Sequence, residues 1–324
     1  MMSSEQINQE IQRLLNIRVA DTTLIVYKRA YDEYLKYCTK RRLPISTAAE
    51  IDWALAHFLA YLSLTGQPKS RAHMAFWGLL FVRPDLARVL HFANAVRKGL
   101  IRSHPVISRP PLTWPITVLI AVTMAKNGFV NEALATLVAF DGLLRISEFI
   151  NLKIGDVALP SDSRLGSRIH KSRTVLHIRK SKTGDHQSSE LYDRGVTSLL
   201  RRHIRPYRDR LHRSLFRIRS VRDYRAVFKN AIASLHLQHC KFVPHSLRHG
   251  GATHAIRTGN SMATIQQRGR WKSASSATIY LQQAAAVRLD IRIPQRQHDY
   301  ASELVSNLSE VMSRLMPSAQ RRAR

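Results

Sequence analysis

The chain has 324 residues, 44% of them hydrophobic, and its 51 Lys and Arg against 22 Asp and Glu give a formal net charge of +29. This excess of cations indicates a polyanionic partner and favours nucleic acid over a membrane or an acidic substrate, although it does not separate an enzyme from a passive binder. The two cysteines, Cys38 and Cys240, show none of the paired spacing of a disulfide framework or a zinc site, so we expect a reducing compartment and no bound metal.

A helical domain is predicted over residues 21–103, after an N-terminal extension of residues 1–20. The segment DTTLIVYKRAYDEYLKYCTKR opens with Asp21, which we expect to cap a helix, and repeats apolar residues at helical spacing. EIDWALAHFLAYLSLTG predicts a second helix closed by Gly66, and SRAHMAFWGLLFV and DLARVLHFANAVRKGLIR predict two more. The next segment, SHPVISRPPLTWP, has four prolines, which disfavour helix and central strand, so residues 104–115 are predicted to be a linker between domains.

Residues 116–296 are predicted to form a second, mainly helical domain that contains a small antiparallel sheet, an α+β fold. ITVLIAVTMAK and NEALATLVAFDGLLRISEFINL each predict a helix, and TVLHIRKSKTG and SSELYD predict strands joined by a turn at Gly184. VRDYRAVFKNAIASLHL, SLRHGGATHAIRTG and SMATIQQRGRW predict further helices. Residues 297–324 are predicted to hold a last amphipathic helix, from Tyr300 to Met316, and a basic tail.

Two motifs in this second domain place cations beside a possible phosphate. LLRISE brings Arg145 and Glu148 within one helical turn, a pair that on its own is most simply a helical salt bridge. PHSLRHGGATH brings His245 and Arg248 within one turn at a helix start, where free N–H groups and two side chains can face one anion. For His249 we expect a packing role, because it need not share the face of its neighbours.

The third motif, RGRWKSASSATIYLQ, contains Trp271 and Tyr280. Aromatic residues are usually core residues, and either one alone would be interpreted as packing. The order of the motifs is more informative: LLRISE, SKTG, HSLRHGGATH, GRW and IY together resemble the tyrosine recombinases, the family that includes phage integrases and Cre. The resemblance covers roughly the last two thirds of the chain.

The resemblance implies a role for each of five residues. Arg145 is the first catalytic arginine, Lys182 is the lysine of the hairpin, His245 and Arg248 are the His-x-x-Arg pair, and Tyr280 is the nucleophile. It also implies a fold in which a helical core-binding domain and the catalytic domain form a clamp around duplex DNA.

Trp271 stands where many members have His and Cre-like members have Trp. Its indole N–H can donate to a phosphate oxygen but cannot titrate, so His245 is the better candidate for the general base. Glu148 is implied to orient catalytic groups, although a plain salt bridge would give the same sequence. Lys180 falls on the same strand face as Lys182, so spacing does not exclude Lys180 as the general acid.

The implied reaction is site-specific recombination through a covalent 3′-phosphotyrosyl intermediate, with no cofactor, metal or ATP. The implied partners are double-stranded DNA with inverted-repeat sites and three further copies of the chain, as a homotetramer on two sites. The terminal helix then docks into a neighbouring protomer or covers the core of its own domain. Two alternatives are a type IB topoisomerase and a catalytically inactive DNA-binding relative.

Trp271, the absence of an evident arm-binding domain and the basic tail suit a recombinase of a eukaryotic mobile element, DIRS-like or Crypton. We expect no membrane-spanning run and no secretory signal, because MMSSEQINQEIQRLL lacks the order of charged and apolar regions that such a signal has. The expected location is the nucleus if the host is eukaryotic and otherwise the cytoplasm. The sequence leaves open the DNA site and the choice among integration, excision, inversion and resolution.

Overall fold

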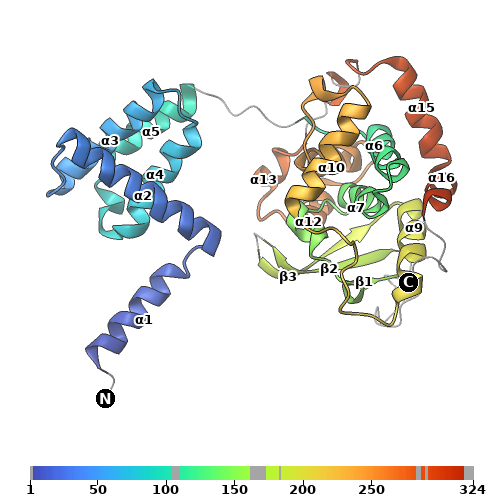
Figure 1. Ribbon diagram of the computed structural model, residues 1–324, viewed down its shortest axis with the longest axis horizontal. Coiled ribbons are helices and arrows are strands. Elements are labelled where there is room, and N and C mark those ends of the chain that lie inside the picture. Colours follow the sequence, from blue (N-terminus) through green and yellow to red (C-terminus); the bar gives the residue numbers. More distant parts are fainter. Residues whose placement is uncertain are drawn as a thin grey trace. The chain divides into compact units, whose positions relative to one another are not determined.

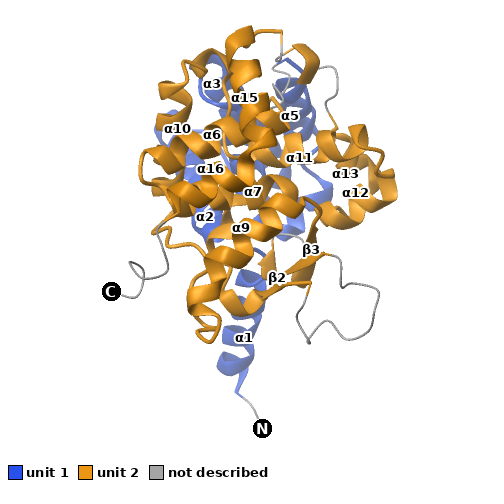
Figure 2. Ribbon diagram, turned by 90° about the vertical axis from the view of Figure 1, so that its right-hand side faces the viewer, with its two compact units in different colours: residues 1–107 blue, residues 108–324 orange. Residues whose placement is uncertain are grey.

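The chain divides into two compact units, residues 1–107 and 108–324, which are described separately (Figures 1 and 2). The division falls inside the segment predicted as a linker. The structure is a computed structural model that describes residues 3–103, 110–160, 173–181, 184–281, 286–288 and 291–316. None of the described helices is both long enough and apolar enough to cross a membrane.

Unit 1 is helical throughout its described part. Its elements are α1 (Ser4–Asn16), α2 (Asp21–Arg41), α3 (Ala48–Leu64), α4 (Lys69–Val82), the 3-10 helix η1 (Pro84–Arg88) and α5 (His91–Ser103). Tyr34, Leu55 and Leu59 lie at the centre of its core and are almost fully buried. Burial of each such side chain contributes roughly 1.5–3 kcal/mol, and the core therefore holds α2, α3, α4 and α5 together.

Three expectations for unit 1 can be compared with the structure. Asp21 is the first residue of α2 and does not cap it, because Ala20 occupies the cap position. Gly66 has φ +65°, the left-handed conformation expected after a helix end. The predicted helix DLARVLHFANAVRKGLIR is two elements, because the buried carboxylate of Asp52 accepts hydrogen bonds from the N–H groups of Phe92 and Ala93, at 2.9 and 2.7 Å, and so fixes the start of α5.

Unit 2 is mainly helical, with one small sheet (Figure 2). Its described elements are α6 (Trp114–Lys126), α7 (Val130–Asp141), α8 (Ile146–Ile150), η2 (Ile154–Asp156), β1 (Val157–Ala158), β2 (Thr174–Ser181), β3 (Gly184–Leu191), α9 (Arg194–Ile204), η4 (Arg205–Tyr207), α10 (Val221–Ser234), η5 (Gln238–Cys240), α11 (His245–Arg257), α12 (Met262–Gly269), α13 (Ala274–Thr278), α15 (Gln295–Ser306) and α16 (Leu308–Leu315). Helices α6 and α7 are apolar nearly all round and form the centre of the core. The predicted fold class is confirmed.

The three strands pair antiparallel in the order β1-β2-β3, with Val157 opposite Leu176 and Ser181 opposite Gly184. Gly184 is the first residue of β3, and residues 182 and 183, which precede it, lie outside the described part. The two-residue strand β1 was not predicted, because so short a segment carries no alternation of apolar and polar residues.

The predicted boundaries of several helices in unit 2 were wrong. NEALATLVAFDGLLRISEFINL forms α7 and α8 and not one helix, because Leu143 between them takes φ +50°. The terminal helix expected from Tyr300 to Met316 is α15 and α16, separated at Asn307. Trp114, placed in the linker, begins α6, whose first turn tolerates the following proline. Helices α9 and α13 were not predicted.

Helices α15 and α16 pack against α6 and α9 of the same chain. Ala301, Leu304, Leu308 and Met312 are buried there in the core of unit 2. Of the two roles expected for the terminal helix, the structure shows the covering of its own domain. Docking into a neighbouring protomer stays a prediction.

Candidate active site

The turn between α7 and α8 places the backbone carbonyl of Leu143 between two buried arginines. Leu143 has φ +50°, a conformation that costs a non-glycine residue about 1 kcal/mol, and its side chain is fully buried. Its carbonyl accepts hydrogen bonds from Nη1 of Arg248 and, at 3.3 Å, from Nη2 of Arg270. These charge-assisted bonds stabilise the turn. The turn places Arg145 at the N-cap position, directly before α8.

Glu148 is the centre of an ion-pair network at the start of α8. One of its oxygens accepts from Nη1 of Arg145 at 2.7 Å and from Oγ of Ser181 at 2.9 Å. The other accepts from the backbone N–H of Arg145 at 2.8 Å and from Nη2 of Arg270 at 2.6 Å, and lies 3.9 Å from Nη1 of Arg248. Burial raises the pKa of Glu148, but Arg270, Arg145 and Arg248 together lower the pKa by more than burial raises it. The net shift is downward, and the carboxyl group is ionised.

Arg248 lies in the first turn of α11 and is fully buried. Its Nη2 donates to the carbonyl of Gly269, so α11 is joined to the end of α12 as well as to Leu143. Burial, and then the charges of Arg145 and Arg270, lower the pKa of Arg248 to about 9, which still leaves the guanidinium protonated near neutral pH.

Two glycines allow these helices to approach so closely. A Cβ on Gly251 of α11 would lie 2.2 Å from the carbonyl oxygen of Phe140, and a Cβ on Gly269 would lie 1.8 Å from the ring of Trp271. Real Cβ atoms do not come so near, so both positions require glycine. The second glycine of HGG and the glycine of GRW are thereby explained by packing.

Tyr280 follows α13 and is half-buried, with its ring among other rings. The ring centre lies 4.4 Å from that of His249, 4.7 Å from that of Trp271 and 5.6 Å from that of His245. Cζ of Arg248 is 5.5 Å from the centre of the tyrosine ring. The structure therefore brings Tyr280 beside Arg248. Arg145 joins the same cluster through Glu148, which pairs with both arginines.

His245 and His249 occupy different environments on α11. His245 is exposed at the helix start and lines a cavity together with Arg145. His249 is buried and stacked on Tyr280, with ring planes 24° apart, and burial, His245 and Arg248 lower its pKa to about 4. His249 is therefore neutral near pH 7, which fits the packing role expected for it. Its ring also supports the ring of Tyr280.

Of the sequence-predicted site residues, six lie in this one cluster: Arg145, Glu148, His245, Arg248, Trp271 and Tyr280. Lys182 lies outside the described residues. Lys180 is exposed near the end of β2, opposite Asp185.

Sequence reasoning missed Arg270, which is buried and has φ +56°. Its ion pair with Glu148, at 2.6 Å, is shorter than those of Arg145 and Arg248. It also missed Arg268, which donates to the backbone carbonyl of Asp141 at 2.7 Å and joins the end of α12 to the end of α7. A buried arginine looks like a surface arginine in a sequence, and the only available signal was the basic residue within GRW.

The cluster carries more positive than negative charge. Arg145, Arg248 and Arg270 surround the single carboxylate of Glu148. Nε of Arg248, Nε of Arg270 and Nε1 of Trp271 are buried without a hydrogen-bond acceptor among the described residues. Buried donors and uncompensated charge are stabilised by an anion, so the arrangement suits a bound phosphate. No three His, Cys, Asp or Glu side chains of the described part are grouped to hold a metal ion.

Comparison with known proteins finds proteins of similar fold. The chain is similar in fold to lambda integrase, solved as a dimer bound to a COC′ core site, with a TM-score of 0.55, 16% identity and coverage of 87% of this chain and 96% of that chain. It is also similar to the Tn1549 transposon integrase, solved with transposon right end DNA, with a TM-score of 0.58, 14% identity and coverage of 88% and 96%. No curated protein sequence matches it. The model of the phage integrase family matches residues 117–286, more than half of the chain, which therefore belongs to this family of tyrosine recombinases.

Proposed function

We propose that the chain is a site-specific DNA recombinase that cleaves and rejoins strands through a covalent bond between Tyr280 and a 3′-phosphate. The observation that carries the proposal is the gathering of Arg145, Arg248 and Arg270 around one carboxylate, directly beside the half-buried Tyr280. The positive charge of the guanidinium groups attracts a phosphate, and the tyrosine supplies the nucleophile that phosphodiester cleavage needs.

In the first step the hydroxyl oxygen of Tyr280 attacks phosphorus and the bond from phosphorus to the 5′ oxygen breaks. His245, exposed beside the tyrosine ring, accepts the tyrosine proton, and Lys182 donates a proton to the leaving 5′ oxygen. Arg145 and Arg248 stabilise the charge on the nonbridging oxygens, and the indole N–H of Trp271 adds a donor. A 5′-hydroxyl from the partner duplex then attacks the phosphotyrosine, so bond energy is conserved without ATP or a metal.

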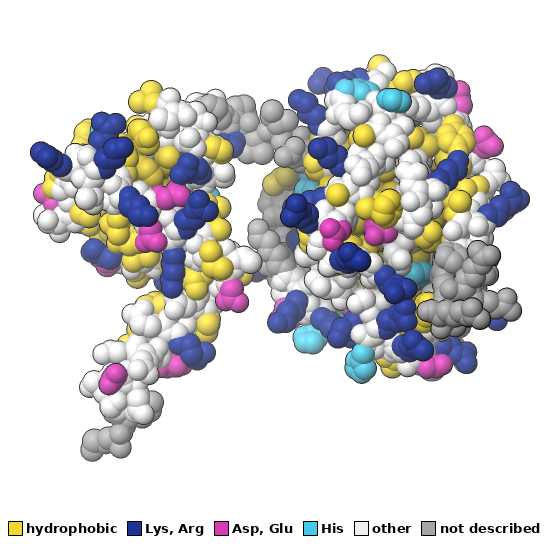
Figure 3. All heavy atoms as spheres, viewed as in Figure 1, with side chains coloured by type: hydrophobic (Ala, Val, Ile, Leu, Met, Phe, Trp, Pro, Cys, Tyr) yellow, Lys and Arg dark blue, Asp and Glu magenta, His cyan; other side chains and the backbone are white. Residues whose placement is uncertain are grey.

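The partner is double-stranded DNA with inverted-repeat sites, bound by a homotetramer that joins two such sites. Lys and Arg side chains are spread over the face of each unit that Figure 3 shows, and acidic side chains are few there, which suits a polyanion. Two solved relatives of similar fold hold DNA, and one of them is a transposon integrase. The proposal further includes a eukaryotic mobile element, DIRS-like or Crypton, as the source, with a nuclear location if the host is eukaryotic and a cytoplasmic one otherwise.

The test is covalent trapping. A DNA site is first selected from a random pool by the purified chain and then nicked close to the cleavage point, so that the freed 5′ end is lost and rejoining is blocked. We expect an adduct that survives denaturing electrophoresis and forms in EDTA without ATP. An adduct that needs a metal or a nucleotide would contradict the proposal, and relaxation of supercoiled plasmids that lack the site would indicate a type IB topoisomerase.

Binding to this site should weaken steeply with salt, because each phosphate neutralised by Lys or Arg releases a condensed counterion. For about six to ten phosphate contacts, affinity should fall on the order of 1000-fold or more between about 50 and 200 mM salt. Fluorescence anisotropy with labelled DNA measures this dependence. A flat response would remove DNA as the main partner.

Lys182→Ala should slow cleavage of ordinary DNA, because an alkoxide is a poor leaving group near neutral pH. Substitution of sulfur for the leaving 5′ oxygen should restore cleavage by this variant, since a thiol has a pKa of roughly 8.5 and leaves without an acid. Arg145→Ala should stay slow on both substrates, because its charge acts on oxygens that sulfur does not replace. Rescue of Lys180→Ala in place of Lys182→Ala would assign the acid to Lys180.

A further inference from the structure

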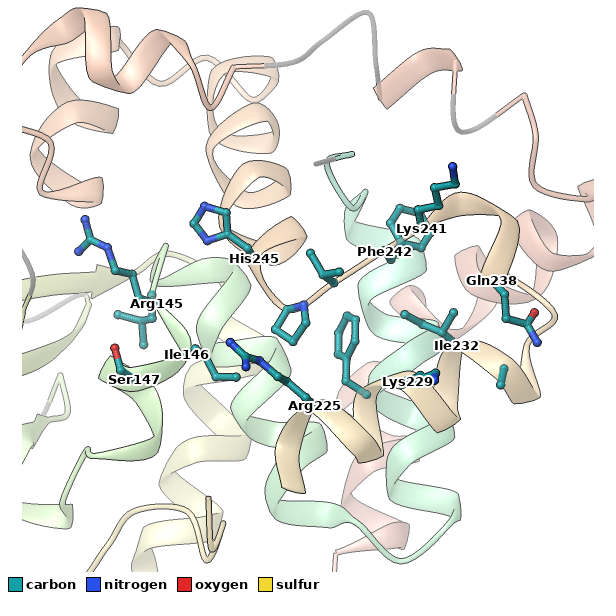
Figure 4. Close-up of a pocket in the computed structure, with 15 residues that line it drawn as sticks. Arg145, Ile146, Ser147, Arg225, Lys229, Ile232, Gln238, Lys241, Phe242 and His245 are labelled. Atoms are coloured by element: carbon teal, nitrogen blue, oxygen red, sulfur yellow. The ribbon is translucent and has the colours of Figure 1, made fainter. Parts of the chain in front are cut away.

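A cavity of about 990 Å³ lies beside the active-site cluster, and its lining other than Arg145 and His245 has no part in the proposed cleavage chemistry. It is enclosed by the start of α8, one face of α10 and residues 238–245, which lead into α11 (Figure 4). Arg145 and His245 lie at one end of the cavity, and Lys241 and Phe242 lie toward the other. Arg145, a proposed ligand of the cleaved phosphate, and His245, the proposed general base, therefore form one end of its wall.

The floor and the rim of this cavity differ in chemistry. The floor is apolar and includes the rings of Phe228 and Phe242 and the side chain of Ile232, all three of them buried. The rim carries the exposed cations of three residues, Arg225, Lys229 and Lys241. No Asp or Glu is among the described residues that line it. A ligand complementary to such a site has a flat apolar body and a phosphate beside it, which is the chemistry of a nucleotide.

We propose that the cavity receives an unstacked nucleobase of the DNA strand, from the nucleotide next to the phosphate that Tyr280 attacks. The inference rests on the proposed function, because it takes the phosphate to be bound by Arg145, with the general base His245 beside it, at the end of the cavity. A base in a regular duplex faces its partner and not the protein, so it enters this cavity only by leaving the stack. The apolar floor then replaces lost stacking, and Lys241 or Lys229 binds the next phosphate.

Such a site has a use in strand exchange. After cleavage, the strand that ends in the free 5′-hydroxyl leaves its own duplex and moves to the partner duplex. A base already held out of the stack beside the cleaved bond makes this departure easier. The competing arrangement is an intact duplex that lies across the mouth of the cavity with every base stacked.

The experiment uses 2-aminopurine, a base whose fluorescence rises when it is unstacked, placed in turn at each position flanking the cleaved phosphate of the selected site. We expect a several-fold rise at one such position on binding of the full chain. Ala233→Phe fills the cavity from a half-buried position on α10 and should abolish the rise while binding and adduct formation persist. Ala226→Phe is the matched control, since Ala226 is exposed on the same helix and is not part of the lining.

Lys241→Ala is a second variant, at an exposed position where loss of the side chain does not endanger folding, and should reduce the rise. Adduct formation without a rise at any flanking position would overturn the inference and leave the proposed function intact. An undiminished rise in Ala233→Phe would also overturn it, because the base would be held elsewhere. Binding without adduct formation would overturn the proposed function, and the inference with it.

Discussion

Tyr280→Phe should bind the selected DNA with unchanged affinity and form no covalent adduct. The substitution removes one oxygen and leaves the ring, which packs on His249 and Trp271, so the fold and the phosphate site are preserved. A nicked substrate and a denaturing gel measure the adduct, and anisotropy measures affinity. The expected loss is complete within detection, because the substitution removes the oxygen that attacks phosphorus.

Tyr224 and Tyr300 are the alternative nucleophiles if Tyr280→Phe still traps DNA, and the structure favours Tyr300. Tyr224 is fully buried, shares a 2.7 Å hydrogen bond with Thr136, and burial raises its pKa, all of which disfavour attack. Tyr300 is 40% exposed on α15 and accepts a hydrogen bond from Lys126. Trapping by Tyr280→Phe that is lost on further change of Tyr300 to Phe would place the nucleophile on α15 and refute the proposed site.

Glu148→Ala should lower the free energy of unfolding by about 3–5 kcal/mol, the usual cost of removing one partner from a buried ion pair. It leaves Arg145, Arg248 and Arg270 close together without the carboxylate that compensates them. Cleavage should fall strongly, because the side chain of Arg145 loses the bond that orients it. Urea unfolding and single-turnover cleavage measure the two effects. A destabilisation below about 1 kcal/mol would show that Glu148 is an ordinary surface partner.

Glu148→Gln is the matched control, with nearly the same shape and no charge. The folded-state pKa of Glu148 is lowered from its ordinary 4.5, so its charge stabilises the fold above that value and the stabilisation is lost as the pH falls through the folded-state pKa. The stability difference between wild type and Glu148→Gln should therefore be full near neutral pH and disappear in acid. A difference that is independent of pH would mean that the charge is not what matters.

The sequence predicted the parts of the site that are encoded in short motifs. HSLRH places His245 and Arg248 one helical turn apart whatever the rest of the chain does, and the two side chains do meet Tyr280. The order of the motifs then identified the family and the fold class. The packing of Trp271 on Tyr280 was not predicted and is known from the structure.

The sequence could not predict the features that depend on distant partners. Apolar residues continue at helical spacing through LVAFDGLLRISEF, so periodicity alone does not show the break at Leu143, although Gly142, the C-cap of α7, is a local stop signal. The break is held by Arg248 and Arg270 from much later in the chain. The start of α5 likewise depends on Asp52. Periodicity marks apolar faces and is silent about buried arginines such as Arg270, which satisfy their charge through the fold.

The most direct measurement identifies the residue to which the DNA is covalently bound. Wild-type chain trapped on a nicked substrate is digested with nuclease and trypsin, and the peptide SASSATIYLQQAAAVR, residues 273–288, contains Tyr280 as its one tyrosine. We predict that fragmentation mass spectrometry finds the residual nucleotide phosphate on Tyr280. A phosphate on a serine or threonine of this peptide, or on a tyrosine of another peptide, would contradict the assignment of Tyr280 as the nucleophile.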